Sequence, residues 1–185
     1  MLLQYETRRL MLKIIGPDYA RQVLNFYLDD KALFEQYESD RSPNFYSEGH
    51  QHTILQVEYG LALKMQQIRF YVFLKEQPEQ IIGTVCLYHI SNTYSHAELG
   101  YKFSSKFHHN GYASEAVEKL LDIAFTELNI HRVTAHVQGD NHPSIRLLTG
   151  LGFEKEGICR DFLYLHGKWE DHLQYSLIAP SYYYL

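Results

Sequence analysis

Short runs of alternating apolar and polar residues indicate a series of β-strands along the chain. In the first run, 9–15, Leu10, Leu12 and Ile14 share one face, and Gly16-Pro17-Asp18 then ends the strand and begins a helix. Later runs predict strands over 68–74, 81–90, 97–103 and 132–138, with a closing hairpin of 157–165 and 168–178 that turns at His166-Gly167. A turn at Glu76 to Glu79 joins the first two of these later runs into another hairpin.

A long amphipathic helix is the clearest element of the pattern. It extends from Tyr112 to about Leu128, with apolar residues three and four positions apart and charged residues on the opposite face. Its apolar positions are Ala113, Ala116, Val117, Leu120, Leu121, Ala124, Phe125 and Leu128. A short helix follows Pro143, and an interrupted helical pattern covers 18–65. These elements predict an α/β (α+β) fold with a mixed, mostly antiparallel sheet, in a single domain over residues 1–185.

Composition narrows the class of protein. The chain has 185 residues, 45% hydrophobic and 21% charged, which is typical of a globular domain that needs no metal or disulfide to fold. The net charge of −5 argues against a surface that binds nucleic-acid phosphates. The sequence has no run of 18 apolar residues, which a membrane span would need. Its charged start does not resemble a secretory signal, so we expect a cytoplasmic protein. Cys86 and Cys159 form no Cys-x-x-Cys pair and are expected to be reduced core thiols.

Eleven histidines raise the question of a metal site. Pairs occur at His50 and His52 and at His108 and His109, but none forms a His-Glu-x-x-His motif or a Cys/His set with zinc spacing, so no metal is expected. The aromatic end of the chain, 182–185, is either a loose tail or an apolar patch that packs on a neighbour.

Two strand-to-helix connections carry the candidate chemistry. The first is the polar loop between the strand that ends at Phe103 and the helix that begins at Tyr112. The start of a helix has unpaired N–H groups and a partial positive charge, which favour a phosphate group, and Gly111 lets the backbone approach a ligand. The second connection begins at Asn141, about thirty residues later. The first connection taken alone is weak evidence of a phosphate site, because an ordinary strand-to-helix loop has the same features.

Together, these two segments resemble the GCN5-related N-acetyltransferases (GNAT family), in the RimJ/RimL-like branch of ribosomal-protein alanine and serine acetyltransferases. The resemblance covers nearly the whole chain and includes ETRRL at 6–10, IGT at 82–84, AELGY at 97–101 and GFEKEG at 152–157. It implies the acyl-CoA N-acyltransferase fold. It also implies transfer of an acetyl group from acetyl-CoA to a primary amine, by direct attack with both substrates bound.

The resemblance also implies a cofactor site. The family's acetyl-CoA loop, Gln/Arg-x-x-Gly-x-Gly/Ala, falls on residues 108–113, where Gly111 and Ala113 match the pattern. His108 replaces the usual Gln or Arg, and His109 stands where an extra glycine is common, so we expect a stiffer loop. The implied cofactor-binding residues are Tyr101, Phe103, His108, His109, Asn110, Gly111, Tyr112, Ala113, Asn141 and Ser144. Among these, Tyr101 to Phe103 would pair with pantetheine as an added strand would.

The resemblance implies two catalytic residues. Many members have a tyrosine that protonates the leaving thiolate, but this chain has Leu148 there, and Ser144 is the nearest hydroxyl one turn earlier. Glu98 matches the family's Ala-Glu-Leu-Gly-Tyr motif and is the candidate base that takes a proton from the amine. Alternatively, Ser144 only satisfies an amide at the helix start, and Glu98 only pairs with a cation on a neighbouring strand.

The acceptor amine is not specified by the sequence. The segment from Asp29 to Met65 and the closing hairpin correspond to the variable walls of the family's cleft. Tyr37, Phe45 and Tyr46 are candidates to line it, with at least one of them expected to fill the core. A ribosomal or other protein N-terminus, a small amine and an antibiotic all stay open as the acceptor, and the protein is expected to be a monomer or a homodimer.

Two other functions stay open from the sequence. The missing tyrosine and the altered loop are also consistent with a non-catalytic acetyl-CoA-binding regulatory module. A nucleotide-binding protein of another fold is a weaker alternative, because the chain has no Gly-x-x-x-x-Gly-Lys-Ser/Thr motif.

Overall fold

The computed structural model describes residues 1–180, so the aromatic end of the chain at 182–185 lies outside the described residues. The elements follow one another as β1 (Gln4–Glu6), β2 (Leu10–Lys13), η1 (Pro17–Tyr19), α1 (Ala20–Asp29), α2 (Lys31–Gln36), η2 (Pro43–Tyr46), α3 (Glu48–Leu63), β3 (Ile68–Leu74), β4 (Gln77–Ser91), β5 (His96–Phe103), η3 (Ser105–Phe107), α4 (Tyr112–Thr126), β6 (Arg132–Gln138), α5 (His142–Gly150), β7 (Glu154–Leu165) and β8 (Lys168–Ile178). No described helix is long and apolar enough to cross a membrane.

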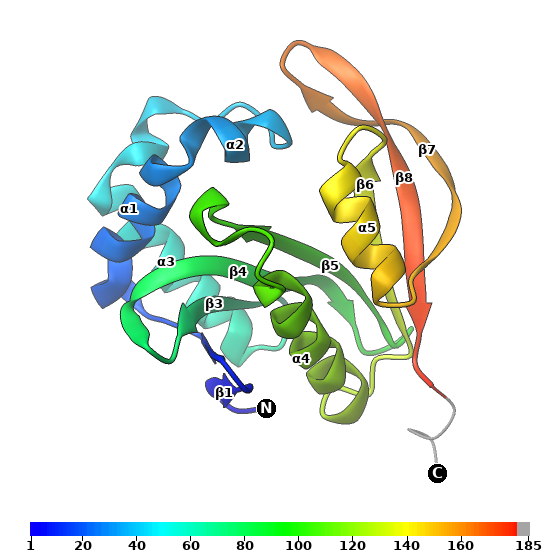
Figure 1. Ribbon diagram of the computed structural model, residues 1–185, viewed down its shortest axis with the longest axis horizontal. Helices are drawn as coiled ribbons and strands as arrows, with labels where there is room; N and C mark the ends of the chain where they lie inside the picture. The colour runs from blue at the N-terminus through cyan, green and yellow to red at the C-terminus, as the bar shows by residue number, and fades with distance from the viewer. Residues whose placement is uncertain (181–185) are drawn as a thin grey trace.

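The strands form one eight-stranded sheet in the order β1-β2-β3-β4-β5-β6-β8-β7 (Figure 1). All neighbours are antiparallel except β5 and β6, which are parallel and are joined by the crossover helix α4. The mixed, mostly antiparallel sheet predicted from the sequence is therefore confirmed.

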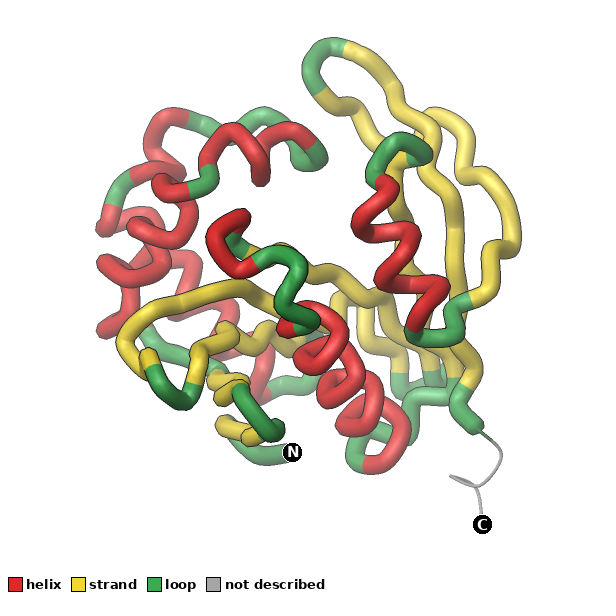
Figure 2. The backbone as a smooth tube through the Cα atoms, viewed as in Figure 1, coloured by secondary structure: helices red, strands yellow, loops and turns green. Residues whose placement is uncertain are grey.

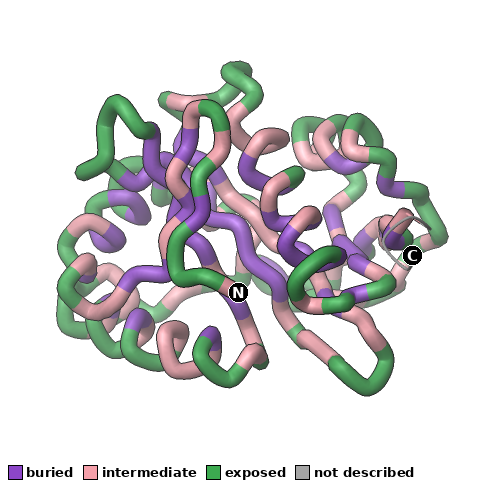
Figure 3. Tube along the Cα trace, turned by 90° about the horizontal axis from the view of Figure 1, so that it is seen from below, coloured by how far each residue is buried: buried purple, intermediate pink, exposed green. Residues whose placement is uncertain are grey.

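Both faces of the sheet are covered by helices. Along β3, Phe70 and Val72 belong to the apolar cluster that contains the buried side of α4, whereas Tyr71 and Phe73 belong to a second cluster with α1 and α3. Alternate residues of one strand thus pack on opposite faces, which is why β3 is apolar at nearly every position. The buried strands run through the middle of the molecule in Figure 3.

The predicted amphipathic helix is confirmed as α4. Its buried residues are Ala116, Val117, Leu120, Leu121, Ile123, Ala124 and Phe125. The helix ends at Thr126 rather than near Leu128, and the chain leaves it through Asn129, which adopts a positive φ of 53°.

Several strand boundaries differ from the predicted ones, the largest shifts being at the start of the chain, at the start of β4 and at β7, which begins at Glu154 and not at 157. The short β1 was missed because three residues are too few to show a period, and β2 is shorter than the predicted 9–15. β4 begins at Gln77 rather than 81, so the predicted turn lies at the start of a strand. Pro78 is tolerated there because it falls where the register with β3 shifts, between the pairs Phe73 with Ile81 and Leu74 with Gln77.

The two cysteines are free but differ in burial. Burial raises the pKa of the Cys86 thiol to about 11, as expected for a core thiol. Cys159 is only partly buried on β7, where its Sγ donates to Oε1 of Gln174 at 3.3 Å. The prediction of two core thiols is therefore right for Cys86 and wrong for Cys159.

The close approach of Gly83 and Phe103 gives a stability test. A Cβ at Gly83 would lie 2.4 Å from Cδ1 of Phe103, whose ring fills the space across from the glycine. We expect Gly83→Ala to lower the free energy of unfolding by about 1–3 kcal/mol, measured by denaturant titration. Gly157→Ala, in a strand where no atom lies within 4 Å of the added Cβ, is the matched control. Equal losses in the two variants would contradict this packing.

Candidate active site

The sheet opens between its two parallel strands. β5 and β6 are paired only at their first residues, with Ala97 opposite Val133 and Glu98 opposite Thr134, although they continue to Phe103 and Gln138. Beyond these pairs the strands diverge (Figure 1). The far half of β5 is paired with β4 alone, so its other edge is left open to a ligand.

A cleft of about 680 Å³ lies at this opening. Its walls come from the end of α2, both diverging strands, the loop before α4 and the first turns of α4 and α5. Figure 2 shows the loop after η3 leading directly into α4. Of the predicted site residues, the cleft is lined by Tyr101, Phe103, His108, His109, Gly111, Tyr112, Ala113, Asn141 and Ser144. Glu98 and Asn110 do not line it.

The start of α4 has the geometry expected of a phosphate site. Gly111 is the N-cap residue with φ 75°, and it is followed by Tyr112, Ala113 and Ser114 in the first turn. The first amides of a helix have no partner within the helix, so an anion in the cleft meets several N–H donors here. Asn110 instead folds the loop, donating from Nδ2 to the His108 carbonyl at 2.9 Å.

The two histidines of the loop have different conformations. His108 is extended, with φ −64°, and its Nε2 donates to the carbonyl of Phe103 at 2.9 Å, which ties the loop to the end of β5. His109 has φ 61°, in the left-handed region that favours glycine. The backbone thus keeps the shape that a glycine would adopt, with a side chain added.

Arg9 braces the same loop from the start of the chain. Its Nε donates to Oε2 of Glu115 at 2.6 Å, its Nη1 donates to the Asn110 carbonyl at 3.0 Å, and its guanidinium lies 4.5 Å from the centre of the Tyr112 ring. Burial opposes the charge on Glu115, but hydrogen bonds from Thr7 and Arg9 hold its pKa below the usual value. Sequence reasoning missed this brace. Its only signals were an arginine in the opening motif and a glutamate in the first helical turn.

Ser144 and Tyr101 form a hydroxyl pair inside the cleft. Their oxygens are 2.6 Å apart, and Asn141 caps α5 by accepting from the Ser144 amide at 3.2 Å. The amide at the start of α5 is thus satisfied by Asn141 and not by the Ser144 hydroxyl. Burial raises the pKa of Tyr101 to about 12, so its proton stays in place at neutral pH. Leu148, which lines the cleft one turn further along α5, offers no polar group.

Glu98 lies on the other face of the sheet, between two histidines. Its Oε1 is 3.1 Å from Nδ1 of His89, and its Oε2 is 3.8 Å from Nδ1 of His136. His136 does line the cleft, and its ring stacks on Phe162 with centroids 4.3 Å apart. In the sequence His136 is one of eleven histidines and belongs to no motif. Its proximity to Glu98 depends on the pairing of β5 with β6.

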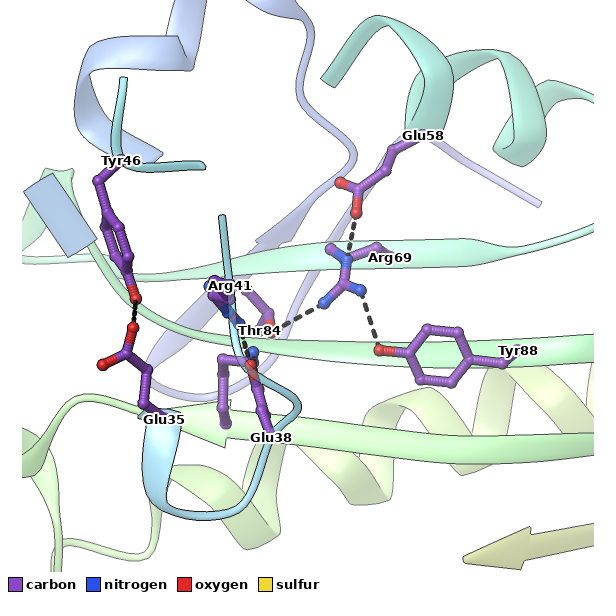
Figure 4. A network of polar contacts seen from close by, with 9 residues as sticks. Glu35, Glu38, Arg41, Tyr46, Glu58, Arg69, Thr84 and Tyr88 are labelled. Atoms are coloured by element: carbon purple, nitrogen blue, oxygen red, sulfur yellow. Dashed lines mark hydrogen bonds and ion pairs between the residues drawn. The ribbon is translucent and has the colours of Figure 1, made fainter. Parts of the chain in front are cut away.

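A network of charged residues supports the wall of the cleft that is formed by the chain after α2 (Figure 4). Glu38 is paired with both Arg41 and Lys102, and Arg69 donates from Nε to Oε1 of Glu58 at 2.7 Å. Burial lowers the pKa of Lys102 to about 8. The network fixes the segment after α2 against β5, so that segment forms a wall of the cleft.

The three aromatic candidates of this wall are divided between two roles. Tyr37 lines the cleft, whereas Phe45 and Tyr46 pack against the apolar cluster formed with α1 and α3. The expectation that at least one of them fills the core is confirmed.

Comparison with known proteins gives the family. Residues 9–154 match the family model described as the acetyltransferase (GNAT) domain. The chain belongs to the GNAT family. The uncharacterized N-acetyltransferase p20 of Bacillus licheniformis is 40% identical over 129 residues, which are 70% of this chain and 72% of that protein.

Solved structures agree with the GNAT assignment. The ribosomal-protein-S5-alanine acetyltransferase of Vibrio fischeri is 27% identical, with a TM-score of 0.90 over 97% of this chain and 98% of that chain. RimJ of Mycobacterium smegmatis, solved in complex with CoA-disulfide, is 24% identical and has the same fold, with a TM-score of 0.86 over 92% of this GNAT chain and 82% of that one.

These findings confirm the GNAT fold and the RimJ/RimL-like resemblance, and this GNAT chain is an N-acetyltransferase. They give no support to a non-catalytic regulatory module, and the fold is not that of the nucleotide-binding alternative.

The two loop histidines allow a matched test of backbone conformation. We expect His109→Gly to be more stable than His109→Ala by about 1 kcal/mol, because alanine is strained in the left-handed region. At His108 the order should reverse, with the alanine variant more stable by about 0.4–1 kcal/mol, because glycine has more freedom to lose on folding. Thermal unfolding of the four variants measures both differences. The same order at both positions would contradict the loop conformation.

Proposed function

We propose that this enzyme transfers the acetyl group of acetyl-CoA directly to a primary amine, with both substrates bound in the cleft. The observation that supports this most strongly is the opening of the sheet between β5 and β6, beside the free amides of α4. In this proposal the whole chain, 1–185, acts as one domain.

The cleft residues fit acetyl-CoA. The pyrophosphate is held by the amides from Gly111 onward, in a loop completed by His108 and His109. The pantetheine arm lies along the open edge of β5 at Tyr101 and Phe103 as an added strand, and Asn141 closes the opposite side. Asn110 takes an indirect part, because its side chain shapes the loop.

The group that assists the leaving thiolate and the group that receives the proton of the amine lie on opposite faces of the sheet. Ser144 and Tyr101 lie on the side of α5, where the Ser144 hydroxyl donates a hydrogen bond to the departing thiolate. Glu98 lies on the other side and receives the proton that the amine loses. The amine's electron pair forms the bond to the acyl carbon as the carbon–sulfur bond breaks and the thiolate leaves. An α-amino group, with a pKa near 8, needs less help from a base than a lysine near 10.4.

We propose a protein N-terminus as the acceptor, with a small amine as the alternative. The structural relative from Vibrio fischeri is named for the alanine of a ribosomal protein, and the acceptor side here is formed by α2 and the chain after it. A ribosomal acceptor would place this enzyme in the cytoplasm.

The cofactor site is tested by thermal unfolding with acetyl-CoA, CoA and ATP in parallel. A ligand at 100 times its dissociation constant stabilises the protein by about 2.7 kcal/mol, which raises the melting temperature by about 5–10 °C. We expect this shift with acetyl-CoA and CoA but not with ATP. Acetylation of N-terminal peptides, polyamines and aminoglycosides is then followed by release of free thiol. No shift with acetyl-CoA, or no acetylation of any amine, would refute the proposal.

The role of Ser144 is tested by comparison with Thr149, another residue of α5 with a hydroxyl group. Ser144→Ala should lower kcat by about 100-fold, the lower end for general acid catalysis, because a thiolate is a fairly good leaving group. Its affinity for acetyl-CoA should be unchanged. The control is Thr149→Ala, because the Thr149 hydroxyl donates to the Ile145 carbonyl at 2.9 Å and does not line the cleft. A normal kcat for Ser144→Ala would remove Ser144 from the mechanism.

A further inference from the structure

His136 stands between the cleft and the carboxylate assigned as the base. Its imidazole lines the cleft, whereas Glu98 does not. The Nδ1 of His136 is the ring nitrogen on the Glu98 side, 3.8 Å from Oε2. A proton released in the cleft therefore meets this imidazole before it meets the carboxylate.

The position of the His136 ring is fixed by packing. The ring stacks on Phe162 of β7 with 26° between the planes, and Phe162 in turn contacts His172 of β8, with ring centroids 5.2 Å apart. The groups that face His136 are thus Glu98 from β5, Phe162 from β7 and the neighbouring His172 from β8. Burial lowers the pKa of His172, which favours the neutral form of this second imidazole.

A path from His136 to solvent continues on the other side of Glu98. Oε1 of Glu98 lies 3.1 Å from Nδ1 of His89, on a bulge of β4 where the register with β5 shifts between Tyr88 and Ser91. The exposed fraction of the side chains rises from 15% for His136 to 28% for Glu98 and 76% for His89. The three groups therefore form a line from the interior to the surface.

We propose that His136 takes the proton of the acceptor amine and that Glu98 and His89 pass it to solvent. The inference rests on the proposed function. The ammonium N–H bond breaks, and the proton goes to the free ring nitrogen of His136. The amine keeps the electron pair that then attacks the acyl carbon. The Nδ1 proton of the imidazolium passes through a bridging water across the 3.8 Å to Glu98, and from there to His89 or water. His136 is then neutral with its proton on the other ring nitrogen, and exchange of that proton with water restores the starting tautomer. An imidazole suits this step because the ordinary pKa of an imidazole lies close to neutral pH, above that of a carboxylate.

The test is the pH profile of kcat/KM for His136→Gln, which keeps a polar side chain that cannot accept a proton. At pH 7 we expect a loss of at least about 100-fold, with recovery towards high pH as the amine loses its proton unaided. Glu98→Gln and His89→Asn should give smaller losses, because water can replace either as a proton carrier. Added imidazole should restore part of the activity of His136→Ala, as expected for a missing base and not for a folding defect.

The control is His96→Gln. His96 lies on the same face of β5 as Glu98, and its Nε2 is 3.1 Å from Oγ1 of Thr134, outside the cleft. It should keep the wild-type profile. A wild-type profile for His136→Gln together with a large loss for Glu98→Gln would overturn the assignment and leave Glu98 acting through water. If the wild-type enzyme itself acetylates no amine although it binds acetyl-CoA, the proposed function fails. That outcome is distinct from failure of His136 alone.

Discussion

The parting of β5 from β6 is the constraint on which the rest of the structure depends. Backbone groups in a sheet are normally satisfied by the neighbouring strand, so a strand that loses its partner midway exposes donors and acceptors at one edge. Here the loss begins immediately after Glu98 and Thr134. The same point sets the position of the cleft, the face on which Glu98 lies and the approach of α5 to Tyr101.

Because side chains alternate along a strand, successive residues of β5 at the opening lie on opposite faces of the sheet and meet different polar groups. Tyr101 belongs to the set of β5 residues on the side of α4 and α5, and its hydroxyl meets Ser144 there. Glu98 belongs to the opposite set and meets histidines instead. In the proposed mechanism, the group that assists the leaving thiolate and the carboxylate that receives the amine proton are thereby kept on opposite faces without any loop to hold them. A register shift of one residue would exchange the two sets.

Local patterns in the sequence were enough to predict α4, most strands and the loop before α4, because each depends on residues close together in the chain. The interpretation of that loop as a phosphate site depended on the family resemblance. The family motif added Glu98 and Ser144. The environment of Glu98 was beyond reach, since His136 becomes its neighbour only through the parallel pairing of β5 with β6, thirty-odd residues apart. The brace of Arg9 on Glu115 likewise joins residues separated by 106 positions. Neither contact leaves a periodic signal.

The brace suggests why the loop tolerates a histidine where glycine is common. A left-handed non-glycine residue costs roughly 1–2 kcal/mol, and such a residue persists only where its surroundings hold it. His109 is held from both sides, because His108 is tied to the Phe103 carbonyl and the next carbonyl, that of Asn110, accepts from Arg9. The same contacts keep Gly111 and the first amides of α4 turned towards the cleft. The stiffness that the sequence predicts for this loop would therefore come from the contacts around the loop as much as from the histidines in it.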